Sequence, residues 1–467
     1  MKLYNTLTRE IDEVKPVHDN EIKVYTCGLT VYSQPHIGNW VPYIYWDVLV
    51  RTLRANGFNV TRVENYTDVG HLVSDDDAGE DKMEKGARAE GLTAWDVAEK
   101  YISIAQHEAY DLLGLTRPEK LVRATSCIDE QIAFVVELEK KGYTYTIDGE
   151  GVYFDTSKLD DYGKLARLDV EGLQAGARVD IGGKKHPTDF ALWKFSPVNQ
   201  KRDMEWDSPW GKGFPGWHLE CSVIARENLG DQIDIHTGGV DHIPVHHTNE
   251  IAQTEALTGK QFSQIWVHNN HLKVDGGKMS KSLGNIYTLH DIQSKGYSLE
   301  AFKLMILSKH YRTEGNFTWE ILEAAQNRLI RWKNIAELRF QQKDMHNSYT
   351  LNFNWAIFAR YLSEDLNTPE ALSYLDRSFF EPIGTHGYLD SNLVSDFDHT
   401  LEVINDLLGI NLDSIRDIST AQKDLINERA KARSDKNWAE SDRIRDELMK
   451  QGIGINDGPH GQIWYRQ

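Results

Sequence analysis

The chain has 467 residues and a mass of 53.5 kDa, which exceeds one ordinary hydrophobic core, so we expect roughly two to four packed units. Its composition, 40% hydrophobic and 26% charged, is typical of a soluble globular protein. The formal net charge of −19 argues against a nucleic-acid partner, because phosphate binding needs a basic surface. It does not exclude one, since the run at 75–81 gathers many acids in what we interpret as a solvated loop, and basic residues cluster elsewhere.

Targeting segments and disulfides are not expected. The N-terminal residues have no apolar core of signal-peptide length, and no stretch reaches the roughly 18 uninterrupted apolar residues that a membrane-spanning helix needs. We therefore expect a cytoplasmic protein with no membrane partner. The cysteines Cys27, Cys127 and Cys221 are odd in number and sparse, which argues against a disulfide framework and fits a reducing compartment. Cys127 lies in a predicted helical stretch, and we assign it to structure.

The first part of the chain is predicted to open a doubly wound, Rossmann-like α/β domain with a parallel sheet. Residues 22–27 read as a strand, 43–56 as a helix and 58–66 as a second strand. Apolar residues then recur at helical spacing over 94–113.

An insertion is expected to split this sheet. A predicted helix at 129–141 is followed by a predicted hairpin at 143–154, with a glycine-containing turn between its strands. We interpret the stretch from about 115 to 215 as the insertion. The sheet is predicted to resume with strands at 233–236 and 265–268.

From residue 289 onward the chain is predicted to be mostly helical. The sequence at 367–370 predicts a helix with Thr368 as its cap and a proline in its first turn. The segment 427–451 mixes basic and acidic residues. Apolar residues also repeat in steps of three and four along one helical face that we assign to core packing: Leu322, Ala325, Leu329, Trp332 and Ala336.

Two segments indicate a nucleotide site. His36 falls in a turn where a helix begins, so its imidazole and the free backbone amides could both face a phosphate. The short motif that it shares with Asn39 is a weak signal, and the alternative that His36 merely caps the helix stays open. Lys278 and Lys281 are more specific, since glycines on their N-terminal side predict a mobile cationic flap. Such cations stabilise the charge that develops when a carboxylate attacks the α-phosphorus of ATP.

A second constellation has the chemistry of a metal site. Cys221 leads into a predicted helix, where the helix dipole would favour a thiolate. His246 and Glu250 stand four residues apart, on one face if that segment is helical. Together with Cys27 they form a set of two thiols, an imidazole and a carboxylate that suits zinc. By spacing alone the set matches no known zinc finger, and buried cysteines beside a surface helix remain the alternative.

The segments around His36 and Lys278 resemble the paired signatures of class I aminoacyl-tRNA synthetases, and residues 215–222 resemble a local signature of cysteinyl-tRNA synthetases. The likeness extends through most of the chain, including 173–180 and 367–371. It implies a two-step ligase in which ATP and L-cysteine form cysteinyl-adenylate, which the 2′-hydroxyl of the 3′-terminal ribose of tRNA(Cys) then attacks. It also implies one zinc ion that binds the substrate thiolate, Mg²⁺ accompanying ATP, and a monomer.

The resemblance also implies roles for individual residues. His218 and His247 are expected to be neighbours of the metal rather than ligands. The expected catalytic residues are His36, Asn39, Lys278 and Lys281; the ATP-binding residues are these four with Gly38, His236, Gly238 and Gly239; the substrate-binding residues are Thr67, Trp217 and Asp241; and the metal ligands are Cys27, Cys221, His246 and Glu250.

The sequence departs from the family pattern in places, and other functions remain open. Asn39 stands where the family motif usually ends in histidine, the loop at 68–83 is longer and more acidic than usual, and Val245 and Thr248 replace residues common beside the metal helix. One alternative is a related ligase that joins cysteine to an amino sugar. The other is a catalytically silent synthetase-like protein that binds RNA or a nucleotide.

The expected domain organisation has six parts. These are residues 1–115, the first half of the catalytic domain; 116–215, the connective insertion; 216–290, the second half of the catalytic domain with the lysine-serine loop; 291–345, a stem-contact region; 346–415, a helical bundle; and 416–467, a small anticodon-binding domain.

Overall fold

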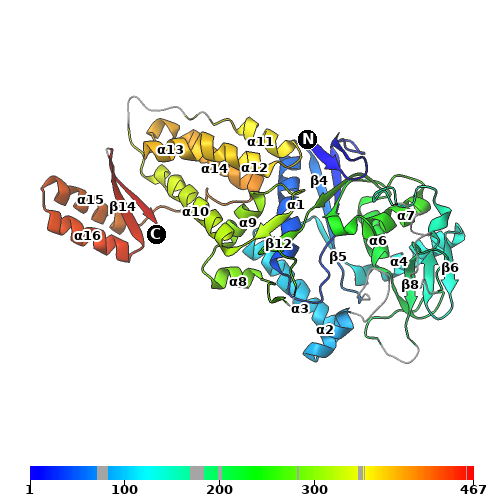
Figure 1. Ribbon diagram of the computed structural model, residues 1–467. Coiled ribbons are helices and arrows are strands. Elements are labelled where there is room, and N and C mark those ends of the chain that lie inside the picture. Colours follow the sequence, from blue (N-terminus) through cyan, green and yellow to red (C-terminus); the bar gives the residue numbers. More distant parts are fainter. Residues whose placement is uncertain are drawn as a thin grey trace. The chain divides into compact units, whose positions relative to one another are not determined.

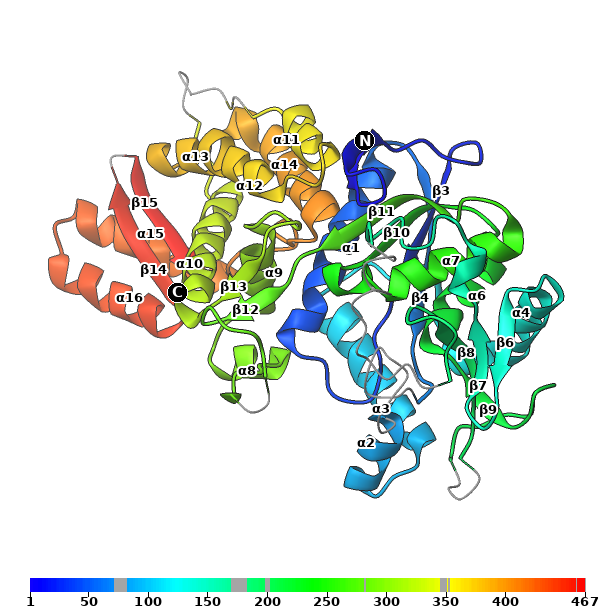
Figure 2. The same ribbon diagram turned by 45° about the vertical axis from the view of Figure 1, so that its right-hand side comes forward.

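The structure, a computed structural model, describes most of the chain as two units (Figures 1 and 2). Among the described residues, no helix is both long and apolar enough to cross a bilayer. The described residues are 1–70, 82–168, 183–197, 202–280, 283–344, 351, 353–458 and 460–466. The first unit comprises Met1–Ile292, Tyr311–Phe317 and Ser363–Leu366, and the second comprises Gln293–His310, Thr318–Leu362 and Asn367–Gln467.

A five-stranded parallel sheet forms the centre of the first unit, which confirms the predicted α/β class. The strand order is β11-β10-β3-β4-β5, and each neighbouring pair is parallel. Because parallel strands are covered on both faces, their apolar side chains are buried on both sides. The strands are β3 (Glu21–Thr26), β4 (Asn59–Tyr66), β5 (Lys120–Arg123), β10 (Ile233–Gly239) and β11 (Ser263–Asn269).

Helices cover the two faces of this sheet. Helix α1 (Ile37–Ala55) lies on one face, and α6 (Trp217–Leu229) and α7 (His246–Thr258) lie on the other (Figures 1 and 2). The predicted start of the first helix at residue 43 was wrong, because α1 already begins at Ile37 and contains Pro42. Pro42 has no N–H and cannot donate a helical hydrogen bond. Burial of 13 of the 19 residues of α1 offsets this loss.

The predicted hairpin is confirmed as part of a separate antiparallel sheet with the order β6-β7-β8-β9. Strand β5 lies within the range expected for the insertion, but it pairs with β4 in the parallel sheet. The elements of this region are β6 (Thr144–Ile147), β7 (Gly151–Phe154), β8 (Phe190–Phe195), β9 (Gly213–Pro215) and α4 (Ile128–Lys140).

Smaller elements complete the first unit. Its described residues include two short strand pairs, one antiparallel and one parallel. A π-helical segment at His107–Leu112 continues α3, within the range where the sequence predicted one helix. The elements are β1 (Lys2–Asn5), β2 (Glu10–Glu13), α2 (Lys82–Glu90), α3 (Ala94–Gln106), β12 (Leu272–Val274) and β13 (Gly315–Phe317).

The second unit is mainly helical, as predicted. The apolar stripe from Leu322 to Ala336 is buried, which confirms its assignment to the core. The cap of α12 was predicted wrongly, since Asn367 rather than Thr368 accepts the hydrogen bond of the first turn, from the N–H of Glu370. The helices are α9 (Leu299–Leu307), α10 (Trp319–Ala336), α11 (Trp355–Ser363), α12 (Thr368–Leu375), α13 (Glu381–His386) and α14 (Val394–Leu408); α8 (Leu289–Ser294) runs from the first unit into the second.

The end of the chain forms a small helix-hairpin module. Its buried core contains Ile444, Leu448 and Trp464. Arg429 is buried and donates two hydrogen bonds of 2.8 Å to the carboxylate of Asp457, so its charge is paired. The elements are α15 (Thr420–Ser434), α16 (Trp438–Lys450), β14 (Ile453–Gly458) and β15 (Gly461–Arg466).

Candidate active site and metal cluster

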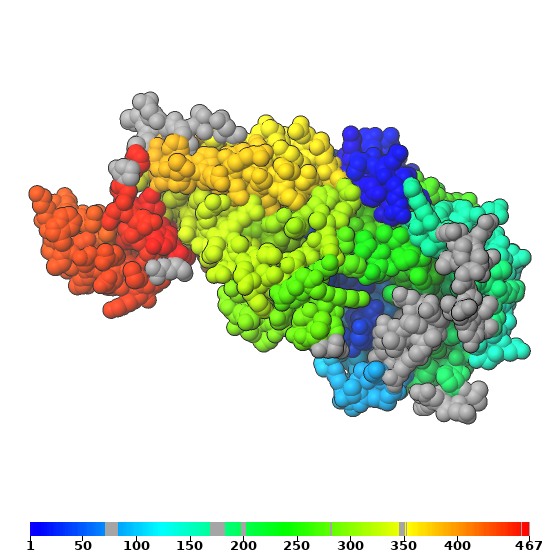
Figure 3. Space-filling model, in the orientation of Figure 1, coloured from blue at the N-terminus to red at the C-terminus, as the bar shows by residue number. Residues whose placement is uncertain are grey.

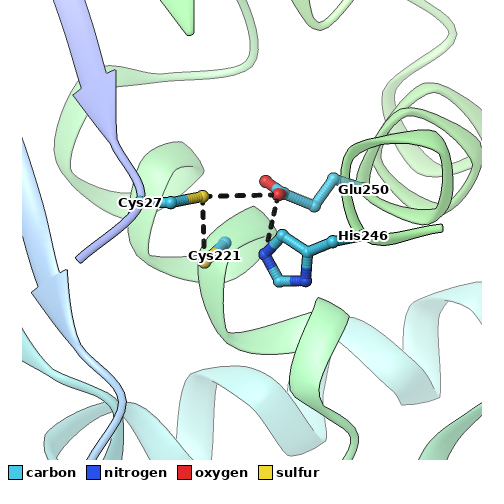
Figure 4. Close-up of side chains that lie close together, drawn as sticks. All are labelled: Cys27, Cys221, His246 and Glu250. Atoms are coloured by element: carbon cyan, nitrogen blue, oxygen red, sulfur yellow. Dashed lines mark hydrogen bonds and ion pairs between the residues drawn. The ribbon is translucent and has the colours of Figure 1, made fainter. Parts of the chain in front are cut away.

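The four predicted metal ligands come together at the carboxyl edge of the parallel sheet (Figure 4). Their ligand atoms all lie within 4.8 Å of one another. The Sγ atoms of Cys27 and Cys221 are 3.9 Å apart, and His246 Nε2 lies 3.1 Å from Glu250 Oε1. The four residues come from three segments far apart in the chain, the end of β3, α6 and α7, so only the tertiary fold brings the set together.

Local structure explains how each ligand is presented. Cys27 follows β3 directly, and its N–H donates to the carbonyl of Thr237 on β10. Cys221 lies in the second turn of α6. His246 is the first residue of α7 and Glu250 lies one turn later, which confirms that the i, i+4 spacing places them on one helical face.

Burial favours the protonated forms of the two thiols and of the Glu250 carboxyl. It raises the pKa of the Cys27 thiol and of the Glu250 carboxyl well above their ordinary values. For Cys221 a hydrogen bond with Cys27 lowers the pKa, but burial and the nearby Glu250 carboxyl outweigh it and the pKa is raised. The helix position of Cys221 was expected to favour a thiolate, and burial reverses that expectation. Two soft thiols, an imidazole and a carboxylate enclosed together have the donor chemistry of a zinc site.

Neutral histidines surround the cluster. His236 Nε2 lies 2.9 Å from Glu250 Oε2, and His247 Nε2 lies 3.3 Å from Cys27 Sγ. His247 continues through its Nδ1 to His268 Nε2 at 2.8 Å. Burial lowers the pKa of His236 to about 3 and lowers those of His247 and His268 well below their ordinary value, so these rings are uncharged at neutral pH.

His247 and His236 both lie closer to the metal cluster than the sequence predicted. His247 was expected to be a neighbour of the metal, yet Cys27, His236, His247 and Glu250 form a second group whose ligand atoms also lie within 4.8 Å. His236 was expected to bind ATP, but it lies behind the cluster, stacked on Trp266. His268 was not predicted as a site residue, although the strand predicted at 265–268 ends at it just as the strand predicted at 233–236 ends at His236.

A cavity of about 700 Å³ opens beside the cluster. In the space-filling view it is the hollow where blue atoms of the N-terminal segment lie below green atoms (Figure 3). Its described lining does not include His236 or Thr67, and Lys281 lies outside the described residues. The predicted site residues that do line it are Cys27, His36, Gly38, Asn39, Trp217, Gly238, Gly239, Asp241 and Lys278.

His36 occupies the N-cap position of α1, and its ring also lines the cavity. The side chain of Asn39 accepts a 2.9 Å hydrogen bond from the backbone N–H of His36, so Asn39 closes the first turn of the helix. Nδ1 of His36 is buried with no hydrogen-bond partner in the described part of the chain. Burial lowers the pKa of His36, so the imidazole is neutral at pH 7. A side chain at Gly38 would meet Met279, since a Cβ there would lie 2.2 Å from its Cε.

The predicted substrate residues occupy different depths. Trp217 begins α6, and its ring lies 4.5 Å from that of His246, so it forms a wall between the cavity and the cluster. Asp241 is 79% exposed at the rim, 3.1 Å from His271 Nε2. Thr67 is only 2% exposed, and its Oγ1 accepts a hydrogen bond from Asn65.

Further cavity residues were not found from the sequence. His242 lines the cavity next to Trp217, and burial lowers its pKa to about 4. Lys273 and Glu314 also line it and form a 2.7 Å ion pair. The only sequence signal for His242 was its position directly after Asp241.

Comparisons with known proteins agree with the geometry. Residues 13–327 match the family model for the tRNA synthetases class I (C) catalytic domain, and residues 416–464 match the cysteinyl-tRNA ligase anticodon binding domain. A protein named cysteine–tRNA ligase 1 from Burkholderia lata is 45% identical, over 99% of this chain and 96% of its own. The cysteine–tRNA ligase of Treponema denticola is 38% identical, over 99% of both chains.

Solved structures support the fold. The methionyl-tRNA synthetase of Mycobacterium tuberculosis in complex with methionyl-adenylate is similar with a TM-score of 0.56 at 13% identity, covering 84% of this chain and 88% of that chain. The LeuRS of Agrobacterium radiobacter, in a ternary complex with tRNA, is similar with a TM-score of 0.58 at 12% identity, covering 86% of each chain. The family models, the full-length relatives and the arrangement of the cluster and cavity together establish that the chain belongs to the cysteinyl-tRNA synthetase family of class I aminoacyl-tRNA synthetases.

Proposed function

We propose that the chain activates L-cysteine with ATP and transfers it to the 3′-terminal ribose of tRNA(Cys). The observation that carries this proposal is the position of Cys27, which belongs to the metal cluster and also lines the cavity that contains His36 and Lys278. A thiol-selective site and a phosphate-binding site therefore share one space.

The first step joins a cysteine carboxylate oxygen to the α-phosphorus of ATP and releases pyrophosphate. His36 and the free N–H groups at the start of α1 face the phosphates, and Lys278, which lines the same cavity, contributes a cation. Asn39 positions His36 by accepting a hydrogen bond from the backbone N–H of His36. Lys281 is assigned the same role as Lys278 from the family motif, and Mg²⁺ accompanies ATP.

Cysteine selection is assigned to the metal cluster. Cys27, Cys221, His246 and Glu250 would hold zinc, which when bound supplies a Lewis acid that takes a thiolate far more readily than an alcohol. Trp217 closes the side-chain pocket, and Asp241 offers a carboxylate to the polar groups of the substrate. Thr67 is buried, and it acts by holding the loop after β3 through backbone hydrogen bonds to Leu29 and Val31.

The helical second unit is assigned to tRNA. Regions 291–345 and 346–415 would contact the tRNA body and 416–467 would read the anticodon, with the protein acting as a cytoplasmic monomer. The match of residues 416–464 to an anticodon-binding model favours tRNA over an amino sugar as acceptor. Residues 1–115, 116–215 and 216–290 keep the catalytic and connective roles expected for them, apart from the placement of β5.

Cysteine-dependent ATP–pyrophosphate exchange tests the first step, with serine as the control substrate and the zinc content measured on the same sample. Exchange with cysteine alone at one zinc per chain is the expected result, followed by charging of purified tRNA(Cys). A folded, zinc-loaded protein that shows no exchange would overturn the proposed activity. Exchange without tRNA charging would instead favour another acceptor.

A further inference from the structure

The loop that follows β3 is held against the end of β4. Leu29 O accepts a 3.0 Å hydrogen bond from the N–H of Thr67, and the N–H of Val31 donates to Thr67 O at 3.2 Å. Thr30 and Thr67 form a parallel bridge at the same place. This pairing continues the sheet for a few residues beyond Cys27, so the position of the Cys27 thiol depends on how the loop is anchored.

Asn65 is the side chain that anchors the loop beside Cys27. It is 1% exposed, and its Oδ1 accepts hydrogen bonds from the N–H of Gly28 at 2.8 Å and from the hydroxyl of Tyr25 at 3.1 Å. Its Nδ2 donates to Thr67 Oγ1 at 3.1 Å. Because the Gly28 N–H can only donate, the orientation of the carboxamide is determined by the network.

The same carboxamide also contacts the other thiol of the cluster. Asn65 Oδ1 lies 3.8 Å from Cys221 Sγ. The loop approaches β4 so closely that a Cβ at Gly28 would lie 1.4 Å from the backbone oxygen of Asn65. Asn65 therefore lies between the two cysteines, in contact with the peptide that follows one and with the sulfur of the other.

We propose that Asn65 is a positioning residue for the metal cluster. By accepting the N–H of Gly28 it fixes the peptide plane after Cys27, and this sets the direction of the Cys27 thiol and its distance from Cys221. Without the carboxamide that peptide keeps only the 3.3 Å hydrogen bond that Cys27 O accepts from the Tyr43 hydroxyl, and the ligand atoms must be ordered when a cation binds. The inference rests on the metal site of the proposed function and assigns a determinant of that site outside the ligand set.

Cobalt binding to the full-length protein provides the test, because Co²⁺ reports both affinity and ligand arrangement through its absorption spectrum. Asn65→Ala is expected to weaken Co²⁺ binding by about 10–100-fold and to shift the sulfur-to-cobalt absorption band. Asn65→Asp keeps an oxygen facing Gly28 and Tyr25, so its affinity is expected to stay close to that of the unmodified protein.

Asn5→Ala is the matched control for loss of a buried asparagine. Asn5 is 2% exposed, and its Oδ1 accepts hydrogen bonds from the N–H groups of Leu7 and Trp266. We expect this variant to lower the free energy of unfolding while leaving the cobalt affinity and spectrum unchanged. A role of Asn65 in stability alone would make the two alanine variants behave alike.

The outcomes separate this inference from the proposed function. If the unmodified protein binds neither Co²⁺ nor Zn²⁺, the metal site and the role of Asn65 both fail. If it binds Co²⁺ and Asn65→Ala binds equally well with the same spectrum, only the positioning role is overturned. Should Asn65→Ala not fold, Asn65→Asp decides, because a tenfold or larger loss of affinity in that variant contradicts the proposal.

Discussion

The metal cluster and the rim of the cavity are both rich in ionisable side chains, but their surroundings differ. The rim pairs are Asp241 with His271 and Lys273 with Glu314, and all four side chains are at least 40% exposed. In the cluster Glu250 is fully buried, and burial rather than solvent determines its protonation. Water screens charges at the rim, whereas each buried group depends on its neighbours, so substitutions in the cluster should have much larger effects.

The sharpest contrast comes from removing a cluster thiol. Cys221→Ser should lose zinc and cysteine activation together, with exchange reduced by at least about 100-fold, because an alcohol is a poor zinc ligand. Zinc content and cysteine-dependent exchange are measured on the same sample. Cys127→Ser is the control, since Cys127 ends a short helix outside the cluster. Normal cysteine activation by a metal-free Cys221→Ser protein would defeat the proposed selection mechanism.

Removing a lysine that stabilises the reacting phosphates should lower the exchange rate more than removing a lysine that is paired with a carboxylate. Lys278→Met is expected to lower the rate of exchange by about 100-fold, because the charge on the leaving pyrophosphate loses a partner. Lys273→Met is the matched control at the same cavity, where the lysine is paired with Glu314, and we expect a change of at most about fivefold. Equal effects of the two substitutions, measured as kcat for exchange, would show that Lys278 has no special role.

A buried carboxyl that is not a metal ligand extends the comparison to the pH dependence of stability. Glu64 on β4 is 5% exposed, and burial raises its pKa to about 7, with Arg62 opposing the shift. The folded chain thus retains a proton that the unfolded chain releases above about pH 4.5, so Glu64 destabilises the fold progressively as the pH rises from about 4.5 to 7.

Glu64→Gln should remove this penalty. Relative to the unmodified protein, the variant should gain up to about 3 kcal/mol in free energy of unfolding between pH 5 and pH 7, measured by urea denaturation. Glu13→Gln, at a side chain that is 61% exposed, is expected to leave the pH profile unchanged. A Glu64→Gln profile parallel to that of the unmodified protein would contradict the raised pKa.

The smallest effect is expected at the rim. His271→Gln removes the 3.1 Å contact with Asp241, and the free energy of unfolding should change by less than about 1 kcal/mol because both side chains are well solvated. Thermal or urea unfolding measures this change, and repetition at high salt should reduce it further. A loss of several kcal/mol would mean that the rim behaves like the buried cluster.

Local patterns predicted much of the fold. The strands at 22–27 and 58–66, the hairpin and the stripe on α10 follow from periodicity, which depends only on neighbouring residues. Helix ends were less well predicted: α1 begins six residues earlier than expected, and Asn367 rather than Thr368 caps α12. Ends depend on which of several capping groups the surrounding structure favours.

For the site, sequence alone determined the residue types and the local spacing, such as the shared helical face of His246 and Glu250. Family resemblance then favoured the zinc set over the alternative of buried cysteines beside a surface helix. Only the tertiary structure placed Cys27 and Cys221, 194 residues apart, within 3.9 Å and moved His236 from the cavity to the back of the cluster. It also revealed His268 and Asn65, because hydrogen bonds between segments that lie far apart in the chain leave no periodic trace in the sequence.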